Sequence, residues 1–353
     1  MKPPSSAKPS TSMPPPPSLS RPTRFPDRAP TSPSASLPAI RRPSAGVLHS
    51  ASPSPSASPA PTADDFSPRS WTDCFDHSLD LHVPSRNAVF RLYHASFTPS
   101  SDFCLLFLHG GGHSALSWAL VADKLRKRCP VIAFDARGHG NSVADDDTDL
   151  SAETQVADAA ELVRTFFKQR GTQVPRLVVI GHSMGGAIAA RLTASKHLER
   201  IVGLVVIDVA VRYVTKAGHV RNTESARLSV PPQLVRATNK DRWTWRTDLE
   251  QSEGYWRGWF QGLSSLFLSV DVAKMLVLAS VDRLDKHLMI AQMQGKFQNI
   301  LIPTAGHAVH EDQPDQTAKV INDYLERNLF LGRLVEGEGE RIFQQREPIP
   351  PCC

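Results

Sequence analysis

The chain has 353 residues, a formal net charge of +5, 29 prolines and 41% hydrophobic residues. Its acidic and basic residues are interspersed outside a basic N-terminal stretch, so the sequence gives little support for nucleic-acid binding. It contains no run of about 18 or more apolar residues, and no apolar segment follows Met1. We therefore expect no membrane span and no secretory signal, and a protein of the cytoplasm, the nucleus or both.

The N-terminal segment, residues 1–65, is rich in proline, serine, alanine and arginine and poor in large apolar residues. Such a composition cannot offset the conformational entropy lost on folding, so this segment is expected to be disordered. Its scarcity of acidic residues also suits an organelle transit peptide, although it shows no convincing amphipathic pattern. The five cysteines lack metal-ligand spacing and fit a reducing compartment.

From Val89 onward, short apolar runs alternate with helix-length periodic segments, a pattern that predicts an α/β fold with a mostly parallel sheet. Several runs are almost continuously aliphatic, as expected for strands covered by helices on both faces. The expected strands are Val89–His94, Phe103–Leu108, Val131–Asp135, Arg176–Ile180, Ile201–Asp208, Met275–Ala279 and Asn299–Ile302. The folded domain is expected to span residues 66–330, followed by a flexible tail over 331–353.

One insertion, at about residues 209–269, interrupts this alternation. It is polar at first and then rich in aromatic residues, among them Trp243, Trp245, Trp259 and Phe267. We expect it to form a helical cap over the sheet. Its aromatic side chains either build a small core of their own or line a lid or partner-binding surface.

The strongest chemical signal is the segment Gly181–Gly185, which reads Gly-His-Ser-Met-Gly between an expected strand and an expected helix. A Gly-x-Ser-x-Gly segment in that context predicts a nucleophile elbow, with Ser183 held in a tight turn at the carboxyl edge of the sheet. The helix that follows supplies backbone N–H groups and the positive end of its dipole. Ser183 is therefore the candidate nucleophile.

A second signal, His109–Gly112, ends the strand Phe103–Leu108 and matches the oxyanion loop of esterases. Glycines allow the backbone to approach a substrate carbonyl closely. We expect the amides of Gly111 and Met184 to be the two oxyanion donors, each typically worth about 100- to 1000-fold in rate.

A serine nucleophile needs a base within hydrogen-bonding reach and an acid that orients this base. His307 follows the last expected strand and is the candidate base, while His310 is expected to cap or pack nearby. Two aspartates follow strands and could serve as the acid, Asp208 and Asp282. In many α/β hydrolases the acid follows the strand that Asp282 follows here. The position of the strand alone therefore favours Asp282 slightly.

At these motifs the sequence resembles the protein phosphatase methylesterases, which remove the methyl ester from the C-terminal leucine of type 2A protein phosphatase catalytic subunits. The resemblance covers roughly residues 64–330. It is carried by Leu108–Trp118, Asp149–Thr154, Gly181–Ala187, Val281–Asp285, Gln292–Gln298 and Gly306–Asp312.

The resemblance implies the α/β-hydrolase fold, a type 2A catalytic subunit as partner, and hydrolysis without a metal or cofactor. It also implies that the acid is Asp208, which leaves Asp282 in reserve. A general small-ester carboxylesterase stays open as an alternative. A catalytically impaired phosphatase-binding protein stays open too, because several helical turns that the family has after its aspartate are missing between Asp208 and His219.

Overall fold

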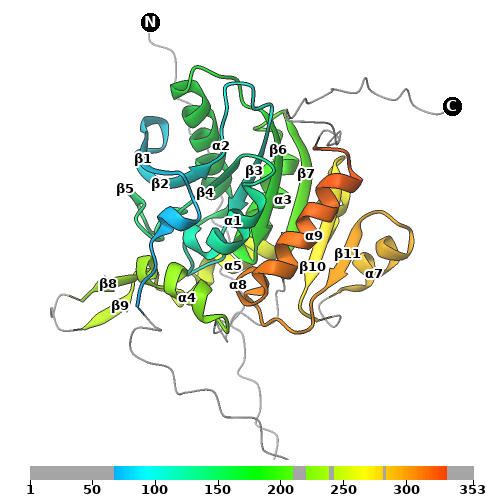
Figure 1. Ribbon diagram of the computed structural model, residues 1–353. Coiled ribbons are helices and arrows are strands. Elements are labelled where there is room, and N and C mark those ends of the chain that lie inside the picture. Colours follow the sequence, from blue (N-terminus) through cyan, green and yellow to red (C-terminus); the bar gives the residue numbers. More distant parts are fainter. Residues whose placement is uncertain (1–66, 210–219, 238–241, 281–283, 332–353) are drawn as a thin grey trace, which may run out of the picture. The chain divides into compact units, whose positions relative to one another are not determined.

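The computed structural model describes residues 67–209, 220–237, 242–280 and 284–331 (Figure 1). The segment 1–65, expected to be disordered, lies outside the described residues, as does the expected tail from residue 332 onward. The reserve acid Asp282 also falls outside them. The connection that follows Asp208 is described only at Val209 and again from Val220.

A nine-stranded sheet forms the centre of the described chain, in the order β1-β2-β4-β3-β6-β7-β10-β11, with β5 paired to β2. Strands β4, β3, β6, β7, β10 and β11 are parallel, whereas β1, β2 and β5 join by antiparallel pairing. The strands are β1 (His77–Val83), β2 (Ala88–Ala95), β3 (Phe103–Leu108), β4 (Val131–Phe134), β5 (Val143–Ala144), β6 (Arg176–His182), β7 (Ile201–Ile207), β10 (Ala273–Leu278) and β11 (Gln298–Leu301).

Helices cover both faces of this sheet (Figure 1). Strand β3 shows why both faces are buried: Cys104, Leu106 and Leu108 join one apolar cluster, whereas Phe103, Leu105 and Phe107 join the other. Helices α2 and α3 contribute to the first cluster, and α1 and α9 to the second. The helices are α1 (Ala119–Leu125), α2 (Ala152–Gln169), α3 (Met184–Ser195), α4 (Thr223–Ser229), α5 (Glu253–Phe260), α6 (Leu263–Ser269), α7 (Lys286–Met293), α8 (Val309–Asp312) and α9 (Pro314–Arg327).

The strands expected from the sequence are all present, with ends that shift by at most two residues. Strand β1 was not expected, because it lies at the edge of the sheet and only Leu81 and Val83 of its side chains are buried. Among the described residues, no helix is both long and apolar enough to span a lipid bilayer.

The described part of the insertion contains helices, as expected, and also a pair of strands that was not expected. It contains α4, α5 and α6, but also a two-stranded antiparallel sheet of β8 (Leu234–Arg236) and β9 (Trp243–Trp245). Trp259 and Phe267 are buried against the α3 side of the main core, whereas Trp243 and Trp245 are 62% and 61% exposed. The aromatic residues therefore divide between core packing and an exposed surface, because strand β9 presents its tryptophans to solvent.

One buried ion pair offers a test of the fold. The carboxylate of Asp158 accepts from Nε and Nη2 of Arg137 at 2.8 and 2.9 Å, and from Nε of Arg86 at 2.6 Å. We expect Asp158→Ala to lower the free energy of unfolding by about 3–5 kcal/mol, because it leaves a buried guanidinium without its partner. The exposed pair of Asp102 and Arg176 is the control, and Asp102→Ala should cost about 0–1 kcal/mol. Urea unfolding followed by circular dichroism compares the two variants, and equal losses would contradict the expectation.

Candidate active site

Ser183 occupies the turn between β6, which ends at His182, and α3, which begins at Met184. Its φ of 50° and ψ of −119° lie in a region that non-glycine residues rarely adopt. The amide of Ser183 donates to the carbonyl of Ile207 on the neighbouring strand β7 at 3.0 Å. This backbone geometry has the form expected of a nucleophile elbow, with the serine side chain projecting from the sheet edge.

The glycines of the elbow are required by close backbone approach. A Cβ on Gly181 would lie 2.1 Å from the carbonyl oxygen of Gly185, and a Cβ on Gly185 would lie 2.4 Å from those of Leu108 and His109. Any larger residue would push α3 away from β3. The glycine loop after β3 and the elbow after β6 therefore pack directly on each other.

The structure brings together three of the residues predicted from the sequence. Oγ of Ser183 lies 3.0 Å from Nε2 of His307, and Nδ1 of His307 lies 2.8 Å from Oδ2 of Asp208. Asp208 follows β7, and His307 lies in the loop between β11 and α8. All three side chains meet at the carboxyl edge of the parallel sheet, where ligand sites of α/β folds are found.

Asp208 is fully buried and also has a positive φ, of 50°. Its second carboxylate oxygen accepts from the amide of Ala279, beyond the end of β10, at 3.1 Å. Because the carboxylate can only accept, Nδ1 of His307 is the protonated ring nitrogen, and Nε2 faces Ser183 with its lone pair. The arrangement can accept a proton from the serine hydroxyl.

Two buried histidines hold the glycine loop. Nε2 of His139 accepts from the amide of Gly112 at 3.0 Å, and Nε2 of His109 accepts from the amide of Ala136 at 2.9 Å. Burial lowers the pKa of His139 to about 4 and that of His109 well below its usual range, so both rings stay neutral acceptors. The amide of Gly112 is thereby occupied.

The two predicted oxyanion donors lie side by side. A Cβ on Gly111 would lie 3.8 and 3.9 Å from Sδ and Cβ of Met184. Within the described parts of the chain, neither amide donates to another protein group. Their role as oxyanion donors stays a prediction.

Sequence reasoning missed the residues that support this loop. Asp135, directly after β4, accepts from the amides of Ala115 and Asn141 at 2.7 and 2.8 Å, and burial raises its pKa to about 6. The glycine-containing segment Phe134–Gly140 after a buried strand was the available signal. His182 was missed as well: its Nε2 donates to the carbonyl of His307 at 2.9 Å and fixes the loop that carries the candidate base.

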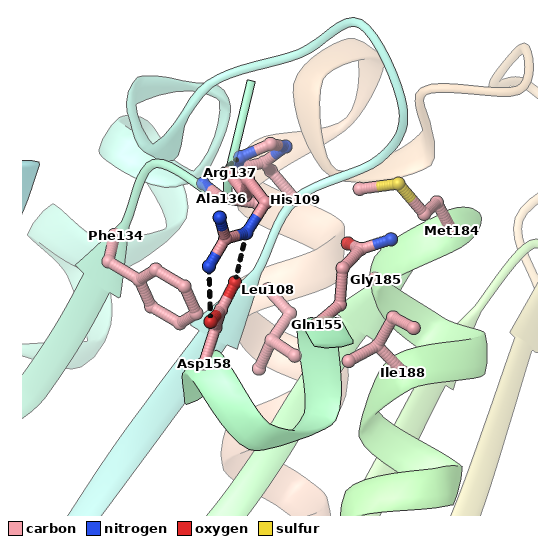
Figure 2. A pocket seen from close by; sticks show the side chains of 10 residues that line it. All are labelled: Leu108, His109, Phe134, Ala136, Arg137, Gln155, Asp158, Met184, Gly185 and Ile188. Atoms are coloured by element: carbon pink, nitrogen blue, oxygen red, sulfur yellow. Dashed lines mark hydrogen bonds and ion pairs between the residues drawn. The ribbon is translucent and has the colours of Figure 1, made fainter. Parts of the chain in front are cut away.

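A small cavity adjoins the elbow (Figure 2). It lies between the glycine loop, the N-terminal half of α2 and the start of α3, and Met184 borders it directly after Ser183. The Arg137–Asp158 ion pair closes one side of it (Figure 2). Its lining consists of Leu108, His109, Phe134, Ala136, Arg137, Gln155, Asp158, Met184, Gly185 and Ile188.

The insertion reaches the same loop from outside. Side-chain carbons of Leu249 would lie 3.4 Å from a Cβ on Gly111 and 3.0 Å from one on Gly112, so Leu249 lies against the loop. Oγ1 of Thr247 donates to the carbonyl of Gly138 at 2.8 Å and anchors the segment. The insertion thus forms part of the surroundings of the site.

Comparisons with known proteins identify the family to which the chain belongs. The family model described as alpha/beta hydrolase family matches residues 105–320. The chain is 37% identical to protein phosphatase methylesterase 1 of Bos taurus over 339 residues, covering 75% of this chain and 88% of the relative. It is 36% identical to protein phosphatase methylesterase 1 of Homo sapiens over 339 residues, covering 75% and 86%. Each alignment runs over 339 residues, which is more than the 75% of this chain that it includes. The relatives therefore contain residues that this chain lacks.

A solved structure supports the fold. E-2-(acetamidomethylene)succinate hydrolase superposes with a TM-score of 0.55 over 71% of this chain and 98% of its own, at 19% identity. At that identity the similarity is one of fold.

The close packing of the elbow gives a second test. We expect Gly185→Ala to lower the free energy of unfolding by at least about 1–3 kcal/mol, because its methyl group would overlap the carbonyls of Leu108 and His109. Gly254→Ala in α5 is the control: nothing lies within 4 Å of its Cβ position, and helix propensity should stabilise that variant by about 0.5–1 kcal/mol. Thermal unfolding of both variants measures the difference. Unchanged stability of Gly185→Ala would contradict the packing described for the elbow.

Proposed function

The chain belongs to the protein phosphatase methylesterases, carboxylic ester hydrolases of the alpha/beta hydrolase family, and we propose that it demethylates the C-terminal leucine methyl ester of a type 2A protein phosphatase catalytic subunit. The observation that carries this proposal is the hydrogen-bonded line from Ser183 through His307 to Asp208 at a strained elbow. We propose the cytoplasm, the nucleus or both as the place where the protein acts.

In the proposed reaction, Oγ of Ser183 attacks the ester carbonyl while Nε2 of His307 takes the hydroxyl proton. The 3.0 Å separation is within reach for this transfer. The imidazolium that forms keeps its Nδ1 proton directed at Asp208, whose carboxylate stabilises the positive charge. His307 then gives the proton to the departing methanol. The C-terminal leucine remains bound to Oγ of Ser183 through its carbonyl carbon.

Water completes the cycle. His307 removes a proton from a water molecule that attacks the acyl-enzyme carbonyl. It then returns this proton to Oγ of Ser183 as the bond from the carbonyl carbon to Oγ breaks, which releases the C-terminal leucine as a free carboxylate. In both halves of the reaction the carbonyl oxygen becomes negatively charged. The neighbouring amides of Gly111 and Met184 would stabilise that charge, since neither is occupied by another group of the described protein.

The nucleophile can be tested on two substrates. We expect Ser183→Ala to reduce kcat by about 10⁶-fold on a methylated phosphatase catalytic subunit and on a nitrophenyl ester alike, because the attacking oxygen is removed. Release of methanol from the phosphatase and of nitrophenolate from the simple ester measures the two reactions. Circular dichroism of the variant controls for folding.

The two substrates also separate the competing functions. Turnover of the nitrophenyl ester without demethylation of the phosphatase would favour a general small-ester carboxylesterase. A folded chain that binds the phosphatase and hydrolyses neither substrate would favour an impaired binding protein. Either result would overturn the proposed methylesterase.

The choice of acid has its own test. We expect Asp208→Asn to lower kcat by about 10⁴-fold with little change in fold, because an amide can present its own N–H to the ring and favour the wrong tautomer of His307. Asp282→Asn is the matched control and should retain nearly full activity. A larger loss in Asp282→Asn than in Asp208→Asn would reassign the acid to Asp282.

A further inference from the structure

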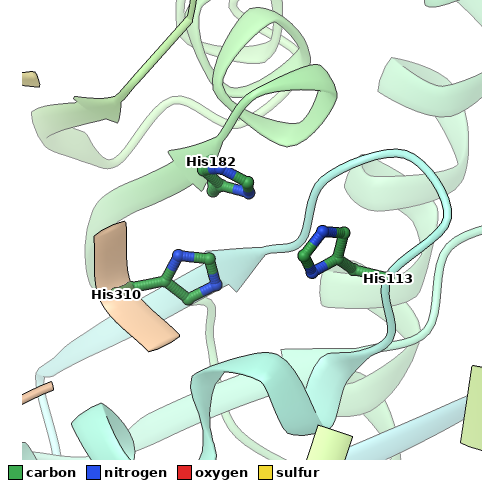
Figure 3. Close-up of side chains that lie close together, drawn as sticks. All are labelled: His113, His182 and His310. Carbon is green, nitrogen blue, oxygen red and sulfur yellow. The ribbon is translucent and has the colours of Figure 1, made fainter. Parts of the chain in front are cut away.

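Three histidines converge beside the elbow from three separate parts of the chain (Figure 3). His113 lies in the loop after β3, His182 ends β6 and His310 lies in α8. Each ring has one nitrogen atom that lies within 4.8 Å of one nitrogen atom of each of the other two rings. Neither Ser183 nor the ring of His307 belongs to this histidine cluster. The cluster is therefore distinct from the proposed catalytic triad.

Hydrogen bonds orient two of the three rings. Nδ1 of His113 donates to the carboxylate of Glu311 at 2.8 Å, which leaves Nε2 as its lone-pair nitrogen. Nε2 of His182 donates to the carbonyl of His307 at 2.9 Å, which leaves Nδ1 as its lone-pair nitrogen. Histidines that bind metals show this arrangement: one ring nitrogen donates to a carboxylate or carbonyl, and the other binds the ion.

Buried polar atoms without partners gather at the same place. Among the described residues, Nδ1 of His182, both ring nitrogens of His310 and Oε2 of Glu311 have no hydrogen-bond partner. His182, His310 and Glu311 are fully buried, and the ring of His310 packs on Trp118 at 4.1 Å between centroids. Buried polar atoms are normally paired, so a cluster of this kind calls for a ligand.

We propose that His113, His182 and His310 form a binding site for one divalent transition-metal ion of the Zn²⁺ class. Imidazole nitrogens suit Zn²⁺, Co²⁺, Ni²⁺ and Cu²⁺, whereas Mg²⁺ and Ca²⁺ prefer oxygen ligands. The fourth position would be filled by water or by the free oxygen of Glu311.

Binding requires a small inward movement. Bonds of about 2.0–2.1 Å from Zn²⁺ to nitrogen in tetrahedral geometry place the ligand nitrogens about 3.4 Å apart. In the structure the three nitrogens lie within 4.8 Å of one another, so they would have to move closer together. His113 is the ring that can move, because it follows the three glycines of the loop and its side chain is 14% exposed, which also gives the ion a route inward. The movement would pull on the loop that carries Gly111. The site therefore touches the region of ester hydrolysis without supplying a reacting group.

The full-length chain, stripped of metal with a chelator and dialysed, provides the test. We expect Co²⁺ to bind with a stoichiometry of one and to develop the visible absorption bands of tetrahedral cobalt, and Zn²⁺ to displace it. His113→Asn should abolish these bands. Glu311→Gln, which keeps the three ligands but weakens the support of His113, should reduce affinity about 10- to 100-fold.

Two control variants exclude binding elsewhere. His287→Asn changes an exposed histidine of α7, and the double change Cys352→Ser and Cys353→Ser removes the C-terminal thiols. Both should leave Co²⁺ binding unchanged. Thermal unfolding with and without Zn²⁺ is a second readout: the ion should raise the Tm of the wild-type chain and leave that of His113→Asn unchanged. Absence of Co²⁺ bands in the wild-type chain, or bands that follow the control variants instead, would overturn the proposal.

Discussion

Parallel pairing among β3, β6, β7 and β10 is the constraint on which the site depends. The register sets Gly181 of β6 opposite Leu108 of β3, and His182 opposite Ile207 of β7. The next residues along these strands are therefore brought together: Ser183 hydrogen-bonds to the backbone of Ile207, and the amide of Asp208 donates to Val277 on β10 at 2.8 Å. A shift of one residue in any of these pairs would turn a side chain of the site to the other face of the sheet. Backbone pairing, which contains no catalytic group, thus determines whether the proposed catalytic groups can meet.

How far the sequence predicted the fold follows from where each strand lies. Strands β3, β6 and β7 are buried on both faces and appear as aliphatic runs, so periodicity and composition were enough to locate them. Strand β1 lies at the edge, where polar and apolar residues alternate over a short length, and it was missed. The β8–β9 hairpin was missed for a related reason: its tryptophans are exposed, so no burial pattern distinguishes it from a loop.

Only part of the candidate site could be predicted from the sequence. Ser183 and His307 could be predicted as nucleophile and base because each stands in a local motif with a fixed relation to a strand. The acid could not be chosen on local grounds, since Asp208 and Asp282 both follow strands, and only the structure places Asp208 against the ring of His307. The histidine cluster had no local signal at all, because His113, His182 and His310 are far apart in the chain and gain their relation only through folding. Which nitrogen of each ring is free depends on hydrogen bonds to Glu311 and to the backbone of His307, which no sequence pattern encodes.

The loop that carries His307 also anchors both sides of the shortened insertion. On one side, Asp208 holds the ring of His307 directly. On the other, the amide of Arg221 donates to Asp312 at 2.6 Å, and the second oxygen of the same carboxylate accepts from Gly306 at 2.7 Å, one residue before His307. Ser225 adds a hydrogen bond from its hydroxyl to the carbonyl of Glu311 at 2.7 Å. The resemblance to the methylesterases places the missing length between these two anchors. Loss of chain between two fixed points leaves the anchored groups in place. The shorter insertion should therefore alter which substrates reach Ser183 more than the hydrogen-bonded line that would act on them.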